Sequence, residues 1–507
     1  MHLSLNNSLG KWILPTTAPF SPEATNYFSR LDAAGDTTYV DYKQPLANYI
    51  DSLVSLGGAY WDDMLSSTSF VGVGIEGVTV PLRDGMTVPT QNNFVVGDLD
   101  QLTGLESNGS TKYIDTGLIG TDLTVNDASW SLNLTSINGY TSADFLMGSG
   151  GNETGAMNFF TVNGVNMESR MQTSARSIIY TGDVSNKTGF IGVSRSSSAE
   201  FDWQFDSVGG TNTVASQSTL STSAFNVFGI SNSAFLNGRL ATYHIGPAID
   251  LATLEGLQAT LLSEIRTAHT FVAAASYFSR LAAAGDTAHV AYKQPLTNYI
   301  TSLVELGGAY WDDMLSATSF VGVGIQGVAV PLRDGMTVPT NNNFVAGDLN
   351  TLTGLKGDGS TKYIATNVAG TALLQDDASA SVHITTANST SNKFYMTNAG
   401  GASLSLRSTP QQALNSSSLA TLGTVPTSGI YGASRASSTT IDVRSNQTNY
   451  STAITSSATS ANTIYVYSIG AAPSADARLA TYHAGPALNL ATLEALQDTL
   501  ITEIAAI

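Results

Sequence analysis

Apolar residues near the start of the chain recur at the spacing of a helix. Between residues 42 and 58 they fall on one helical face: Leu46, Tyr49, Ile50, Leu53 and Val54. Pro45 suits the first turn of such a helix, and the pair Gly57-Gly58 ends it. The same pattern returns at residues 292–308. We therefore predict an amphipathic helix in each half of the chain.

Other segments follow the two-residue period of β-strands. Residues 70–82 alternate apolar with small or polar side chains, which predicts a half-buried strand. Asn163-Gly164 separates two apolar runs and predicts a hairpin, while Asn237-Gly238 marks the entry to a final strand. Glycine-rich turns recur at residues 107–110 and 357–360. Short strands separated by turns about every ten residues are typical of an antiparallel β-sandwich.

A leucine-rich helix is predicted at the end of each half. Two stripes with helical spacing indicate it: Leu251, Leu254, Leu257, Leu261 and Ile265, then Leu490, Leu493, Leu496, Leu500 and Ile504. Asp250 and Asn489 stand directly before these stripes, where their side chains can cap a helix.

The chain contains the same domain twice. Residues 27–115 match residues 277–365 at 71 of 89 positions, that is, 89 less 18 mismatches. A repeat of this length indicates two tandem domains rather than a solenoid. The beginning and the end of each copy, called the frame from here on, are nearly fixed. The middles, at about residues 116–237 and 366–476, differ. The expected parts are a docking arm, a first repeat, a linker and a second repeat, at residues 1–22, 23–268, 269–276 and 277–507.

Composition narrows the classes of function. Apolar residues make up 42% of the chain, charged residues only 12%, and the net charge is −18. Nucleic-acid binding is not expected, because phosphate contacts require clustered Lys and Arg and no basic run occurs. The lack of cysteine excludes disulfides and thiol catalysis. No signal peptide and no stretch of about 18 apolar residues is found, so we expect no membrane insertion.

The first 22 residues have no counterpart in the repeat. They hold Trp12, Ile13 and Leu14, followed by three prolines. An apolar segment followed by prolines is interpreted here as an extended arm that anchors the protein to a partner. A flexible terminus is the alternative interpretation.

One stretch invites an enzymatic interpretation. Retaining glycanases need two carboxylates about 5 Å apart, and Glu200 and Asp202 share one face of a predicted strand. Position 204 is glutamine, however, and the second copy keeps only Asp442. We interpret these residues as solvated strand carboxylates and expect no catalytic residue.

Several aspartates and histidines could be metal ligands, but each also has a structural interpretation. Asp62-Asp63, Asp312-Asp313 and the turn at 357–359 offer oxygens to Ca²⁺, but capping and turn hydrogen bonds account for them. His244 and His483 each lack a second histidine at metal-ligand spacing. We therefore expect no metal and no cofactor.

Three residues are retained as candidates for glycan binding. Arg195 and Arg435 occupy matching positions beside serine clusters, and an arginine on a strand can pair with a sugar carboxylate or with a group of its own fold. Trp203 and Trp130 have no counterpart in the second copy. Such a ring either stacks on a sugar or fills the core. The candidates are Arg195, Trp203 and Arg435.

Several of these segments resemble a module of tailed-phage virion proteins. They are the run 343–363, the paired runs 189–198 and 429–438, and the endings that begin at Arg239 and Arg478. The sandwich part is similar to concanavalin-like and laminin-G-like lectin folds. The resemblance covers nearly all of both repeats. It implies a mainly β virion structural protein with two jelly-roll sandwich domains, each flanked by short N-terminal helices and a C-terminal helix.

Two roles remain open within that class. A tail fibre or baseplate component would contact host glycans, and the divergent middles favour it because changed loops on a fixed frame change what is bound. A capsid-decorating protein is the alternative, favoured by the lack of a fibre shaft. Expected partners are other virion proteins, a host surface glycan and further copies of the chain in a homo-oligomer. The expected location is the virion, assembled in the host cytoplasm; a polysaccharide depolymerase or a free lectin is the remaining alternative.

Overall fold

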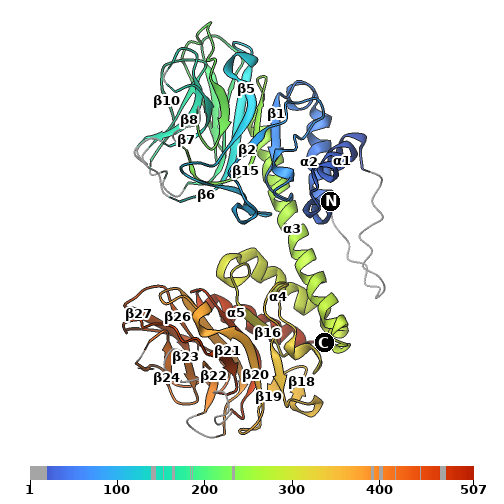
Figure 1. Ribbon diagram of the computed structural model, residues 1–507, viewed down its shortest axis with the longest axis vertical. Coiled ribbons are helices and arrows are strands. Elements are labelled where there is room, and N and C mark those ends of the chain that lie inside the picture. The colour runs from blue at the N-terminus through green and yellow to red at the C-terminus, as the bar shows by residue number, and fades with distance from the viewer. Residues whose placement is uncertain are drawn as a thin grey trace. The chain divides into compact units, whose positions relative to one another are not determined.

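The chain folds into two compact units, Met1–His269 and Thr270–Ile507 (Figure 1). The computed structural model describes residues 20–138, 144–151, 153–162, 166–182, 184, 187–230, 235–389, 393–398, 404–416, 418–445, 447–468 and 475–507. The predicted docking arm with Trp12, Ile13 and Leu14 lies outside these described residues, so its anchoring role stays a prediction.

Two helices open the first unit. Helix α1 (Pro22–Ala34) is one of the short N-terminal helices that the resemblance implies, although its bounds were not predicted. The Ser21 hydroxyl accepts a hydrogen bond from the Ala24 amide at 3.1 Å, and Gly35 ends the helix at a φ of 85°. Helix α2 (Lys43–Leu56) confirms the helix predicted from the apolar stripe. Its buried face includes Leu46, Ile50 and Leu53.

Two antiparallel sheets form the sandwich of the first unit. The first sheet has the order β13-β12-β11-β6-β15-β4-β3, with β1 paired to β15, and the second has the order β10-β9-β8-β7-β14-β5-β2. The strands are β1 (Ser66–Ser69), β2 (Thr90–Asn92), β3 (Leu99–Asp100), β4 (Gly104–Asn108), β5 (Tyr113–Ile119), β6 (Ala128–Ile137), β7 (Phe145–Ser149), β8 (Met157–Val162), β9 (Asn166–Met171), β10 (Ser177–Thr181), β11 (Gly189–Arg195), β12 (Phe201–Phe205), β13 (Val208–Asn212), β14 (Ala224–Val227) and β15 (Asn237–Gly246). Short 3-10 helices lie at η1 (Thr38–Tyr42), η2 (Gly58–Tyr60), η3 (Gly77–Thr79), η4 (Val96–Asp98) and η5 (Gly120–Asp122).

The second unit repeats this topology strand for strand. Its first sheet has the order β18-β19-β30-β21-β26-β27-β28 with β16 on β30, and its second has the order β17-β20-β29-β22-β23-β24-β25. The strands are β16 (Ser316–Ser319), β17 (Thr340–Asn342), β18 (Leu349–Asn350), β19 (Gly354–Lys356), β20 (Tyr363–Ala369), β21 (Ala378–Thr386), β22 (Phe394–Asn398), β23 (Leu404–Arg407), β24 (Gln411–Leu414), β25 (Ala420–Thr421), β26 (Gly429–Arg435), β27 (Thr440–Ser445), β28 (Thr448–Ala453), β29 (Thr463–Val466) and β30 (Arg478–Gly485). The helices are α4 (Lys293–Leu306) and α5 (Leu490–Ala505), with η6 (Ala288–Tyr292), η7 (Gly308–Tyr310), η8 (Gly327–Ala329), η9 (Ala346–Asp348) and η10 (Gly370–Ala372). The predicted mainly β fold of two antiparallel sandwiches is confirmed.

Large rings fill the space between the two sheets of the first unit. Trp130 of β6 is fully buried, and its ring centroid lies 6.0 Å from that of Phe159 and 5.7 Å from that of Phe225, both on the opposite sheet. Strand register places Ala380 at the position of Trp130 in the second unit. Tyr395 and Tyr431 lie in that core, with ring centroids 5.9 Å apart. Trp130 is therefore a core residue rather than a platform for sugars.

The two closing helices lie on the outer face of the first sheet of their units. In the first unit, Gln204 of β12 donates a hydrogen bond to the carboxylate of Glu255 at 2.6 Å. In the second unit, Arg444 of β27 makes the matching contact with Glu494 at 2.6 Å. The caps are as predicted: the Asp250 carboxylate accepts the Ala252 amide at 3.3 Å, and the Asn489 side chain accepts the amides of Ala491 and Thr492 at 2.9 and 3.4 Å.

The predicted linker at residues 269–276 is part of a helix. Helix α3 (Leu251–Ala283) runs without a break through 33 residues, and the units divide within it, between His269 and Thr270. The chain from 257 to 284 contains neither glycine nor proline, and alanine is frequent in it. Because alanine has the highest helix propensity, nothing in this stretch ends the helix.

The strand predicted at residues 70–82 is wrong. Only β1, just before this stretch, is extended; the stretch itself turns at Gly72, whose φ is 68°, and forms η3. The amide of Gly74 donates to the carboxylate of Asp36 at 2.7 Å. Val71, Val73 and Val78 are buried, so the alternating pattern reflects a buried loop with glycine turns rather than a strand. At the predicted 163–164 hairpin, β8 and β9 do pair antiparallel, while the two tip residues lie outside the described part of the chain.

Candidate functional site

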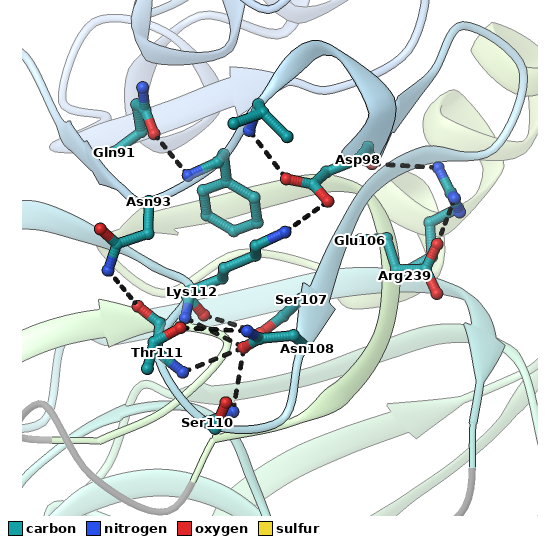
Figure 2. A network of polar contacts seen from close by, with 12 residues as sticks. Gln91, Asn93, Asp98, Glu106, Ser107, Asn108, Ser110, Thr111, Lys112 and Arg239 are labelled. Atoms are coloured by element: carbon teal, nitrogen blue, oxygen red, sulfur yellow. Dashed lines mark hydrogen bonds and ion pairs between the residues drawn. The ribbon is translucent and has the colours of Figure 1, made fainter.

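A polar network occupies the first-unit segment that corresponds, at an offset of 250, to the run 343–363 (Figure 2). The ammonium of Lys112 lies 2.5 Å from a carboxylate oxygen of Asp98, and the other oxygen accepts the Val95 amide at 2.7 Å. Arg239 of β15 contacts the Glu106 carboxylate at 2.5 Å and donates to the Gly104 carbonyl at 2.6 Å. These contacts tie the loop around η4 to β4 and β15.

A tight turn completes this network. The side-chain oxygen of Asn108 accepts hydrogen bonds from the amides of Ser110, Thr111 and Lys112, at 3.1, 3.0 and 3.3 Å (Figure 2). Gly109 takes a φ of 70°, which an L side chain rarely adopts. The side chain of Asn108 thus takes the role of a backbone acceptor in the turn between β4 and β5.

The second unit keeps the Lys–Asp pair and the turn, but Lys356 stands in place of Glu106, so the ion pair of Arg239 with Glu106 is not repeated between Arg478 and Lys356. Lys362 lies 2.6 Å from Asp348, and Arg478 donates to the carbonyls of Asp348 and Gly354. Asp358 stands where the first unit has Asn108, and its carboxylate accepts the three turn amides at 2.8, 2.8 and 3.1 Å. Against the effect of burial, a hydrogen bond from the Thr361 hydroxyl and those from the three amides hold the pKa of Asp358 well below its ordinary value. We call the Lys–Asp ion pair, the arginine contacts with main-chain carbonyls and the Asn108 or Asp358 turn the structural clasp of each unit. The interpretation of residues 357–359 as a hydrogen-bonded turn is confirmed.

Arg195 and Arg435 do not form a glycan site. Both side chains have no exposed surface. Arg195 donates to four main-chain carbonyls, those of Met171, Ser197, Glu200 and Val214, at 2.9–3.2 Å. Arg435 donates to the carbonyls of Leu414, Ser437 and Ile454 at 2.9–3.3 Å. The prediction of glycan contact is wrong for both, because each guanidinium cross-links loops from inside the fold.

Trp203 lies flat on a neighbouring strand. It faces Gly210 across the β12–β13 pair, and a Cβ at Gly210 would come within 2.7 Å of the indole. The ring is half-buried and packs against the core. A glycan contact at Trp203 stays a prediction, since part of the ring reaches the surface.

The carboxylates considered for glycan cleavage lie at one edge of the first sheet. Glu200 precedes β12 and Asp202 lies within it, and both side chains are exposed. The Asp202 carboxylate accepts the Thr211 hydroxyl at 2.7 Å. In the second unit Asp442 is exposed at the matching place.

The predicted metal candidates have partners within the fold. Asp62 accepts the amide of Gly58 at 2.8 Å, and Asp312 accepts that of Gly308 at 2.8 Å. His244 and His483 are buried, and burial lowers the pKa of each to about 4. Over the described ranges, no group of three His, Cys, Asp or Glu side chains could hold a metal ion. Within the same ranges no helix is long and apolar enough to cross a membrane.

The units also differ on the outer face of the second sheet. Phe159 points into the core, so its neighbour Phe160 points to the opposite face. The guanidinium carbons of Arg170 and Arg176 lie 4.7 and 5.2 Å from the centroid of the Phe160 ring. The Arg176 side chain is 54% exposed. Two guanidinium groups therefore share one ring on this face. Only Arg176 of the three reaches the surface, because Phe160 and Arg170 are each 2% exposed.

The second unit carries another arrangement at the same place. Strand register aligns Phe145 with Phe394, and opposite Phe394 stands Arg407 where the first unit has Phe160. The guanidinium carbon of Arg407 lies 4.8 Å from the Phe394 ring centroid. Sequence reasoning missed these arginines because the middles cannot be aligned by a constant offset, and only strand register shows which residues correspond.

Comparisons with known proteins found no family and only distant structural likenesses. No family model and no curated protein matches the chain. Among solved structures, domain 4 of AbnA, an extracellular arabinanase from Geobacillus stearothermophilus in complex with arabinotriose, is similar at 14% identity and a TM-score of 0.25, covering 38% of this chain and 98% of that one. A Trypanosoma rangeli sialidase in complex with sialic acid matches at 11% identity and a TM-score of 0.31, over 43% of this chain and 37% of its own length. The binding domain of botulinum neurotoxin serotype D matches at 14% identity and a TM-score of 0.30, over 39% of this chain and 51% of that one. At these values the likeness carries no argument about function.

Proposed function

We propose that the protein is a structural protein of a tailed-phage virion, displayed on the particle and contacting host surface glycans as a tail fibre or baseplate component. The observation that carries the proposal is a contrast between the two units: their scaffold of strands is the same, whereas the outer face of the second sheet differs. Both units keep the same strand order and the same clasp. The outer face of the second sheet, in contrast, carries Phe160 with Arg170 and Arg176 in one unit and Arg407 in the other.

Such a contrast suits a scaffold whose units contact different chemical groups. The clasp and the buried arginines hold loops together inside each unit, and both units have them. Exposed side chains on an outer face, such as Arg176, make few contacts with the core and are free to change. Guanidinium groups beside aromatic rings suit ligands that combine an acidic or hydroxyl group with an apolar face, as sugars do.

Localisation on intact particles tests the virion role. Immunogold labelling or cryo-EM should place the protein at the tail tip. A fixed number of copies on the head lattice would replace the glycan role with capsid decoration, and no label on particles would refute the virion role altogether.

Substitution on the outer face tests the glycan role. The double variant Arg176→Ser, Arg407→Ser should assemble into particles but adsorb more slowly to host cells. The double variant Arg266→Ser, Lys356→Ser is the matched control, because it also removes two positive charges from exposed positions, and neither lies on the second sheets. Equal adsorption of both variants and the wild type would contradict a contact through this face.

A further inference from the structure

We propose that Asn108 is a site of spontaneous deamidation in the folded protein and that the aspartate formed there rebuilds the turn already present around Asp358 in the second unit. In this reaction the amide nitrogen of Gly109 attacks the side-chain carbon Cγ of Asn108. The new C–N bond closes a five-membered imide, and the Cγ–Nδ2 bond breaks with loss of ammonia, which takes the amide proton. Water then opens the imide ring to a carboxylate.

The surroundings of Asn108 favour the first step. Glycine has no side chain to hinder attack, and the amide of Gly109 donates no hydrogen bond to any described residue. Negative charge develops on the side-chain oxygen of Asn108 as Cγ is attacked. The amides of Ser110, Thr111 and Lys112 point at that oxygen (Figure 2) and stabilise the charge, as donors in an oxyanion hole do. Asn108 is also exposed to the water that the second step requires.

The second unit shows that the product fits. Asp358 occupies the same turn, with Gly359 at a φ of 76° against 70° for Gly109. Its carboxylate accepts the same three amides at equal or shorter distances and gains the Thr361 hydroxyl at 2.6 Å. Opening of the imide at the other carbonyl would yield isoaspartate, which lengthens the main chain by one atom and breaks this pattern. We therefore expect aspartate as the product in the folded chain.

The same molecule contains a matched control. Asn237-Gly238 is the other Asn-Gly pair that lies wholly within the described residues. Gly238 is paired on both sides, with Ser107 of β4 and Ile137 of β6. Its amide can reach the Asn237 side chain only after the ladder opens locally, which lowers the rate by the fraction of time spent open.

Peptide mapping of the full chain during incubation at neutral pH tests the inference, in buffer and in concentrated urea. In buffer, Asn108 should convert at least about tenfold faster than Asn237, and the new peptide should co-elute with that of Asn108→Asp. In urea the two rates should converge. The variant Asn108→Gln should abolish the change at this position, because a longer side chain closes its ring slowly.

Each other result contradicts the proposal. Equal rates in buffer would mean that the fold does not select Asn108. A difference that persists in urea would assign the selectivity to local sequence rather than to the turn. Isoaspartate as the main product in buffer would overturn the assignment of Asp358 as the model of the product.

Discussion

Replacing Arg195 by methionine should make the first unit unfold at a lower urea concentration, because Arg195 stabilises the fold and does not contact an external ligand. Methionine preserves much of the side-chain volume but leaves four main-chain carbonyls without their donors, one in a buried and three in part-buried hydrogen bonds. Each hydrogen bond to a charged group contributes about 1.5–3 kcal/mol, and such losses are not additive. We therefore expect a destabilisation of about 4 kcal/mol. Arg435→Met should cost the second unit somewhat less, about 3 kcal/mol, since three carbonyls are involved.

Urea denaturation of the full chain measures both effects. Trp61, Trp130 and Trp203 lie in the first unit, so intrinsic fluorescence follows mainly that unit. Circular dichroism follows both, and the two units are fitted as separate transitions. Arg176→Met is the matched control; at this half-exposed position the change should stay within about 0.5 kcal/mol. An unchanged urea midpoint for Arg195→Met, together with lost host adsorption, would refute the internal role and restore Arg195 as a contact residue.

Three further predictions follow from buried groups. Burial lowers the pKa of His244, His383 and His483 from 6.5 to about 4, so below pH 6.5 the unfolded chain binds more protons than the folded one. Stability should fall as the pH drops from 6.5 to about 4, by up to about 3 kcal/mol per histidine, and His244→Gln should flatten this dependence in urea titrations at several pH values; a steeper slope would contradict it. Trp130→Ala should destabilise the first unit by about 3–5 kcal/mol, read from its urea midpoint, and a midpoint near that of the wild type would show that the core collapses around the gap. Lys112→Met should lower stability by at most about 1 kcal/mol and make it less sensitive to salt, because its ion pair with Asp98 is partly exposed; an unchanged salt dependence would argue against the pair.

The frame of each unit could be predicted from the sequence because its signals are local. Helix α2 follows from one apolar stripe and a glycine pair, and the 107–110 turn follows from its Asn-Gly dipeptide. The stretch 70–82 could not be predicted, because a buried loop and a strand show the same alternation until the positive φ of Gly72 is known. The role of Arg195 also depends on carbonyls distant in sequence, such as those of Met171 and Val214. The residues next to Arg195 in the sequence do not predict these partners.

The exchange of core residues between the units has a consequence for how such a chain can change over generations. Trp130, Leu146 and Ile191 in one core correspond by register to Ala380, Tyr395 and Tyr431 in the other. Any single member moved between the cores leaves either a cavity or an overlap, so the three must be inherited together. Recombination between the two copies is harmless within the shared segments 27–115 and 277–365. A crossover inside the middles would combine core residues that do not pack together. Selection against such products tends to preserve each middle as one block.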